Sequence, residues 1–75
     1  MGKKEFTYQE ANRIKELLYQ KTNAIRDEQK SLRSNIRNIG FYITDFDYSF
    51  AGFTEYDFDD LVRKGEITII DEDRT

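Results

Sequence analysis

An apolar stripe at helical spacing runs through the first half of this 75-residue chain and constrains its fold more than any other feature. The stripe consists of Ala11, Ile14, Leu18, Thr22, Ile25, Gln29, Leu32, Ile36 and Ile39. Its 3.6-residue period is that of one face of an α-helix. Thr7 and Glu10 form a capping-box pattern before the stripe, and Gly40 after it can take the left-handed conformation that ends a helix. The sequence therefore predicts helix over residues 8–39.

The stripe is compatible with either one helix or two. Thr22 and Asn23 are mediocre helix formers, and a turn beside them would give a helical hairpin. No Gly, Pro or capping box marks such a turn, however, and the stripe keeps its phase across the segment. We therefore expect one continuous helix over 8–39 rather than a hairpin.

The second half predicts a small strand-helix-strand unit. Residues 41–46 alternate in polarity, and residues 66–70 are mostly β-branched, so both segments are expected to be strands. Thr54 and Asp57 form an aspartate version of the capping box, which predicts a helix over 54–64. The direction of strand pairing stays open. The expected fold class is α+β, with a long N-terminal helix (or a helical hairpin) packed on this unit in a single domain, residues 1–75.

The residue types that the chain lacks exclude most catalytic chemistry. It contains no Cys and no His, which excludes thiolate nucleophiles and catalytic pairs built on histidine within this chain. Asp45, Asp47 and Ser49 resemble the start of a calcium-binding loop. That loop needs Gly at its sixth position and Glu at its twelfth, where this chain has Phe50 and Tyr56. We therefore expect no enzyme activity, no catalytic residue, no metal site, no cofactor and no small-molecule substrate.

The sequence also predicts a compartment. No apolar run approaches the ~20 residues of a membrane span, and the segment MGKKEF lacks the apolar core of a secretory signal. The expected location is the cytoplasm, without membrane contact.

Charge is divided between the two halves of the chain. Residues 1–40 have a balance of +4 and residues 41–75 a balance of −7, which gives the net charge of −3. Within the first half, a basic stripe recurs at i, i+4, i+7 and i+11. It consists of Arg26, Lys30, Arg33 and Arg37. These cations could contact phosphate groups or an acidic partner, although a solvated helix face is the simpler interpretation.

Helix length leads to the main functional hypothesis. A helix over 8–39 would be roughly 48 Å long, whereas a compact chain of this size has a radius of gyration of about 11 Å. The first turns would then lack cover from the same chain, and exposed apolar surface indicates a partner. The residues expected to self-associate are Ala11, Ile14, Leu17, Leu18 and Ile25. The sequence thus predicts a non-enzymatic protein interaction module, either a homodimer or bound to another protein; the alternative is a nucleic-acid-associated regulator that uses the basic stripe.

The loop before the second predicted helix is rich in aromatic residues. We expect Phe50 and Phe53 to fill the core, and Tyr48 and Tyr56 to lie at an interface, where tyrosines often anchor a partner.

The segment RNIGFYITDF, residues 37–46, follows a charged helix. In this pattern it resembles short bacterial proteins that have no established activity. The resemblance covers ten residues. It implies a small bacterial or phage accessory protein and assigns no site residue.

Overall fold

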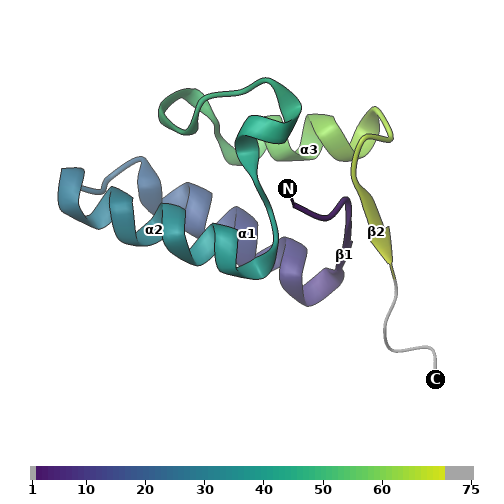
Figure 1. Cartoon of the computed structure of the whole chain (residues 1–75), viewed down its shortest axis with the longest axis horizontal. Coiled ribbons are helices and arrows are strands. Elements are labelled where there is room, and N and C mark those ends of the chain that lie inside the picture. Colours follow the sequence, from purple (N-terminus) through teal and green to yellow (C-terminus); the bar gives the residue numbers. More distant parts are fainter. Residues whose placement is uncertain (1, 71–75) are drawn as a thin grey trace.

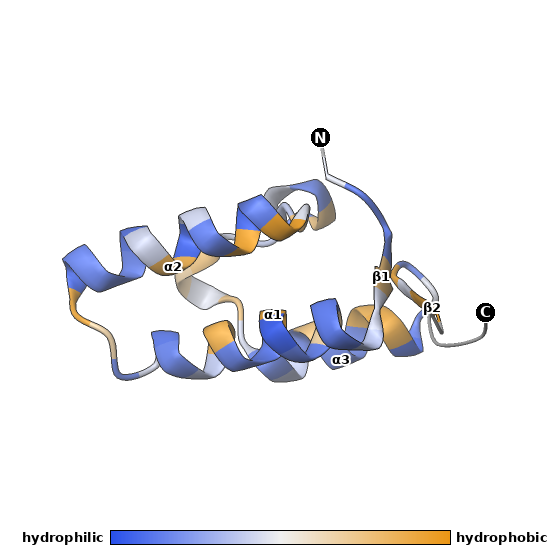
Figure 2. Cartoon of the chain, turned by 90° about the horizontal axis from the view of Figure 1, so that it is seen from below, coloured by the Kyte–Doolittle hydropathy of each residue, from blue (hydrophilic) through white to orange (hydrophobic). Residues whose placement is uncertain are grey.

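The first half of the chain folds as a helical hairpin in this computed structural model, which describes residues 2–70. Helices α1 (Tyr8–Lys21) and α2 (Arg26–Ile39) run side by side in opposite directions (Figures 1 and 2). The prediction of one continuous helix over 8–39 is therefore wrong, and the hairpin alternative describes the structure. The molecule measures 40 × 23 × 21 Å, and the longest helices within residues 2–70, α1 and α2, have 14 residues each.

The turn between the helices is four residues long, residues 22–25. This length explains why the spacing of apolar residues did not reveal a break in the helix. Thr22 ends α1, and its hydroxyl donates to the Tyr19 carbonyl. Ile25 then takes an extended conformation before α2, and its backbone N–H donates to the Glu28 carboxylate at 3.1 Å. Four residues nearly equal one helical turn of 3.6 residues. The apolar stripe consequently keeps its phase across the break. Its members Ala11, Ile14, Leu18, Leu32 and Ile36 are buried, whereas Thr22 and Ile25 in the turn are exposed.

The sheet pairs two short strands from opposite ends of the chain. β1 (Glu5–Thr7) lies parallel to β2 (Thr68–Ile70), with Phe6 opposite Ile69. β2 falls within the strand predicted over 66–70. β1 was not predicted from the sequence. The strand predicted over 41–46 is wrong, because residues Ile43–Phe46 form the 3-10 helix η1. A second 3-10 helix, η2, covers Phe50–Gly52.

Gly40 ends α2 in the way that the sequence predicted. Its φ of 110° lies in the left-handed region, which glycine enters without the steric penalty of a Cβ. The Phe41 N–H donates to the Ile36 carbonyl at 3.3 Å, and the Gly40 N–H donates to the Arg37 carbonyl at 2.9 Å. This pair of bonds satisfies carbonyl groups that the helix end would leave open. It also directs Phe41 into the core.

Helix α3 (Glu55–Arg63) lies where the sequence predicted a helix over 54–64. Its capping box is present, since the Thr54 N–H donates to the Asp57 carboxylate at 3.0 Å and the Asp57 N–H donates to the Thr54 hydroxyl at 3.4 Å. α1 packs against both α2 and α3, so the core lies between the hairpin, α3 and the sheet. The buried apolar residues are Phe6, Ala11, Ile14, Leu17, Leu18, Leu32, Ile36, Phe41, Ile43, Phe53, Phe58, Leu61 and Ile67.

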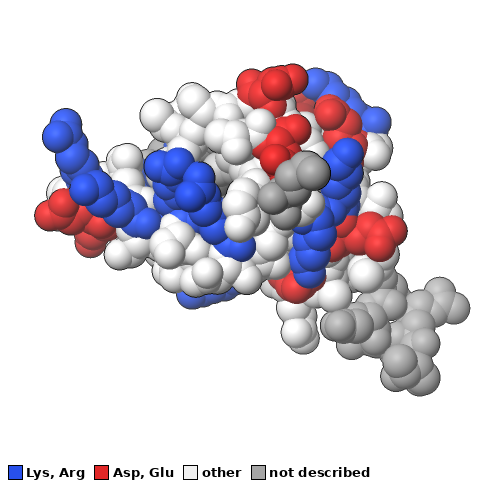
Figure 3. All heavy atoms as spheres, in the orientation of Figure 1, with Lys and Arg blue, Asp and Glu red and all other residues white. Residues whose placement is uncertain are grey.

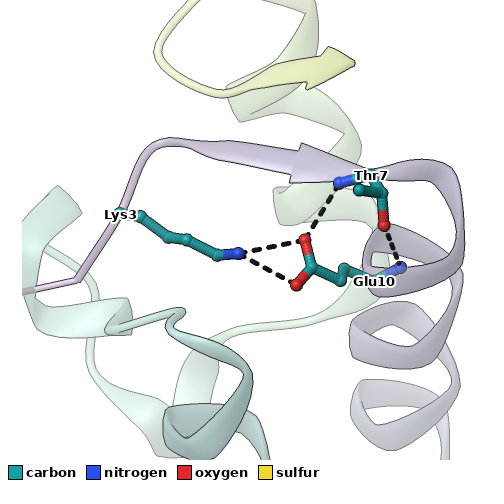
Figure 4. Close-up of polar contacts among 3 residues, drawn as sticks. All are labelled: Lys3, Thr7 and Glu10. Atoms are coloured by element: carbon teal, nitrogen blue, oxygen red, sulfur yellow. Dashed lines mark hydrogen bonds and ion pairs between the residues drawn. The ribbon is translucent and has the colours of Figure 1, made fainter. Parts of the chain in front are cut away.

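The capping box at the start of α1 includes an additional cation (Figure 4). The Glu10 carboxylate accepts from the Thr7 N–H at 3.0 Å, and the Glu10 N–H donates to the Thr7 hydroxyl at 3.1 Å. The Lys3 ammonium donates to both carboxylate oxygens, at 2.9 and 3.0 Å. The Lys3 hydrogen bond and the Thr7 backbone bond hold the pKa of Glu10 below its usual value of 4.5. Glu10 thereby joins the N-terminal segment to α1.

Stability at acid pH should depend on Glu10. A carboxyl whose pKa is lowered by folding contributes stability above its unfolded pKa, and this contribution disappears as the pH falls through the folded pKa. Glu10→Gln removes that titration, so its stability should fall less than that of the wild type between pH 5 and 3. Near neutral pH the cost should stay below about 1 kcal/mol, because the Lys3 pair is exposed. Urea unfolding at each pH, with Glu66→Gln as the exposed control, measures both effects. Parallel pH profiles for wild type and Glu10→Gln would contradict this account.

Candidate binding surface on α2

The residues expected to mediate self-association lie mostly inside the molecule. Ala11, Ile14, Leu17 and Leu18 are each 6% exposed or less, because α2 and α3 cover α1. Ile25 differs, since it lies in the hairpin turn and is 66% exposed. Within residues 2–70, the apolar face of α1 that suggested a dimer is therefore covered by the chain itself.

The two tyrosines expected at an interface lie in different environments. Tyr48 packs edge-on against Phe53, with 5.0 Å between ring centroids, and is partly buried. Tyr56 is 75% exposed on α3. Phe53 is fully buried, as expected, whereas Phe50 is only partly buried. The structure thus places Tyr48 against the core and leaves Tyr56 exposed.

The predicted basic stripe is an exposed face of α2. Arg26, Lys30, Arg33 and Arg37 are all exposed and extend over roughly 16 Å of helix axis. Figure 3 shows basic side chains over α2, with acidic side chains near its left end. The ion pairs within residues 2–70 use other cations, namely Lys3, Arg13, Lys15 and Arg63. None of these ion pairs within the described range involves a residue of the α2 stripe.

A groove lies beside the C-terminal half of this stripe, and we call it the arginine groove. One wall is α2, which contributes Arg33, Ile36 and Arg37. The floor and the opposite wall are Phe41, Ile43, Thr44, Ser49 and Phe50. The groove has a volume of about 230 Å³. Its lining therefore includes two arginines, two hydroxyl-bearing residues and four apolar residues.

The arginine side chains along this side of α2 are placed where they can bind an anion. Arg33 and Arg37 also line a shallow depression with Lys30 and Ser34 on the surface of α2. The Arg37 guanidinium lies 5.6 Å from the centroid of the Tyr42 ring, an arrangement in which an arginine keeps its hydrogen-bond donors available. Together these cations can bind phosphate or carboxylate oxygens through paired N–H groups.

Lys21 holds the wall of the groove that contains Phe50. This role of Lys21 was not predicted from the sequence. Its ammonium donates to the backbone carbonyls of Phe50 at 2.6 Å and Ala51 at 3.2 Å, and lies 4.9 Å from the Phe50 ring centroid. Burial lowers the pKa of Lys21, and the nearby Asp57 carboxylate opposes that shift. The residue is only 6% exposed. Its position one turn after Leu17, on the inward face of α1, was the available signal.

The acidic residues of the second half are dispersed. Asp45 accepts from the Gly2 N–H at 2.8 Å, while Asp59 pairs with Lys15 at 2.9 Å. Among residues 2–70, no group of three or more acidic side chains is placed to hold a metal ion. No helix in the same range is both long and apolar enough to cross a membrane.

Comparisons with protein-family models, with curated proteins and with solved structures found no match to this chain. The interpretation of the α2 surface therefore depends on its geometry and charge.

Proposed function

We propose that this chain is a non-enzymatic binding module that holds nucleic acid through the phosphate groups, using the basic face of α2. The observation that carries the proposal is the row Arg26, Lys30, Arg33 and Arg37, exposed and without a carboxylate partner in residues 2–70. Phosphate contacts to such a row release counterions and so supply binding free energy. Arginine, which provides three of the four cations, binds phosphate through a planar fork of donors.

The acidic half of the chain sets the orientation and the strength of binding. α3 carries Glu55, Asp57, Asp59 and Asp60 against the single cation Arg63, so it repels a phosphate backbone while α2 attracts it. Because only four cations take part and the net charge is −3, we expect modest affinity. A dissociation constant on the order of micromolar or weaker fits a sequence-independent phosphate contact at physiological salt.

Self-association through the inward face of α1 receives less support, because that face is buried in the chain's own core. The proposal includes no catalytic residue, since the chain lacks Cys and His. It also includes no metal or cofactor.

Removal of charge from α2 should weaken binding and its salt dependence together. For four phosphate contacts, the logarithm of the binding constant should fall with the logarithm of salt concentration at a slope of about −2.8 for a single strand. Arg33→Gln with Arg37→Gln should roughly halve that slope. Fluorescence anisotropy of a labelled 12-nucleotide strand, between 50 and 200 mM salt, measures it.

A matched control removes the same number of charges at the C-terminal end of α3, through Arg63→Gln in the helix with Lys64→Gln at its C-cap. The affinity of this control should equal that of the wild type or lie only slightly below it. Equal losses in the two double variants would show that net charge, rather than the α2 face, governs binding. Absence of binding at 50 mM salt would overturn the proposed function.

A further inference from the structure

The arginine groove differs from the remainder of the basic face because a partly exposed aromatic ring, Phe50, lines it. Arg26 does not line this groove, whereas Arg33 and Arg37 line it together with Phe50, which is partly exposed, and with Ile36, Phe41 and Ile43, which are at most 6% exposed. A phosphate backbone alone needs only the cations. A partly exposed aromatic ring beside two arginines instead suits a ligand that joins an anion to a flat ring.

We infer that the arginine groove receives an unpaired base, so that the chain selects single-stranded over duplex nucleic acid. This inference rests on the proposed function, because the cations of α2 supply the phosphate contacts on either side of the base. Proteins that bind single strands combine a positively charged groove with aromatic side chains against which bases stack. Here Phe50 provides the aromatic side chain, and Arg33 with Arg37 provides the charge.

The dimensions and the polar groups of the groove fit one base. Its volume of about 230 Å³ is below that of pockets that bury drug-sized ligands. Thr44 and Ser49 are exposed on the wall opposite α2, where their hydroxyl groups can donate to or accept from a base edge. Duplex nucleic acid keeps its bases stacked inside, so the same groove would be filled only after a base is extruded.

The wall that carries Phe50 is held in place before any ligand binds. Lys21 reaches from α1 and donates to the carbonyls of Phe50 and Ala51, which fixes η2 against the hairpin. Phe50 itself stays partly exposed while it packs beside the core. A ring that is positioned in advance loses less freedom on binding, which favours affinity.

Three ligands of equal length test the inference with the intact chain: oligo-dT, an abasic deoxyribose-phosphate strand, and a duplex. The wild type should bind oligo-dT roughly tenfold more tightly than the abasic strand, since base stacking is lost in the latter. It should also bind oligo-dT more tightly than the duplex. Phe50→Ala should remove the difference between oligo-dT and the abasic strand while affinity for the abasic strand persists.

A second variant is needed because Phe50→Ala could lose discrimination simply by unfolding. Ser49→Leu narrows the groove from an exposed position and leaves every core residue intact, so it should give the same loss of discrimination. In nuclear magnetic resonance spectra of the wild type, oligo-dT should shift the amide signals of Thr44 and Ser49, and the abasic strand should not.

The failures of the two proposals are distinguishable. Equal affinity for oligo-dT and the abasic strand, with the expected salt dependence, would overturn the base-binding groove and leave phosphate binding by α2 standing. No binding of any of the three strands at 50 mM salt would overturn the proposed function as well. Tighter binding of poly-glutamate than of oligo-dT would overturn both proposals in favour of an acidic protein partner.

Discussion

Aspartate at both Ile14 and Leu18 should unfold this chain instead of separating a dimer. Both side chains are at most 1% exposed, and α2 and α3 cover them within one molecule. Burial of an unpaired carboxylate costs several kcal/mol, and a domain of this size has a total stability on the order of 5 kcal/mol. We expect the double variant to lose its helical circular dichroism at 25 °C. The wild type should sediment as a monomer of 9.0 kDa.

The control for this experiment places aspartate on the outer face of the same helix. Asn12 and Tyr19 are exposed, so Asn12→Asp with Tyr19→Asp adds the same two carboxylates without burying them. This control should fold and melt close to the wild type. A wild type of twice the monomer mass, whose Ile14 and Leu18 variant is a folded monomer, would instead restore the dimer hypothesis.

The parts of the fold that could be predicted from the sequence are those determined by residues close together in the chain. The capping boxes of Thr7 with Glu10 and of Thr54 with Asp57 are present, and Gly40 ends α2 at a positive φ. Each of these signals works within five residues. The neighbouring backbone groups that need hydrogen-bond partners are therefore specified locally.

The hairpin and the sheet could not be predicted because they depend on residues far apart or on an ambiguous phase. A turn of four residues preserves the helical period, so periodicity alone does not separate a hairpin from a continuous helix. β1 is three residues long and pairs with residues more than sixty positions away. Residues 41–44 alternate between buried and more exposed side chains as a strand would, but the sheet within residues 2–70 pairs β1 with β2.

The candidate binding surface on α2 could be predicted only in part, because one portion of it depends on residues close together in the chain and the other on residues far apart. The basic stripe follows from spacing along one helix, and it is exposed on α2 as the spacing indicates. The arginine groove needs a second wall, which comes from η1, η2 and the residues between them, and this segment had been predicted to begin as a strand. The self-association hypothesis depended on the helix being continuous. The break between Lys21 and Arg26 removes its basis.

Phe41→Ala should be the most destabilising single truncation of an aromatic residue in this chain. Phe41 is fully buried, and its ring centroid lies between 5.3 and 5.8 Å from those of four others. These rings are Phe6, Phe46, Phe53 and Phe58, which come from β1, η1, the segment before α3, and α3. The side chain thus joins elements that have few other contacts in common.

The expected cost of Phe41→Ala is about 3–5 kcal/mol, the usual range for a buried phenylalanine, because the truncation loses transfer free energy and leaves a cavity. Phe46→Ala is the matched control, since Phe46 stacks on Phe41 but is only partly buried, and it should cost clearly less. Urea unfolding followed by circular dichroism compares the two, and Phe41→Leu should recover part of the loss because it refills most of the cavity. If Phe41→Ala costs no more than Phe46→Ala, the ring cluster around Phe41 does not hold the hairpin, α3 and the sheet together.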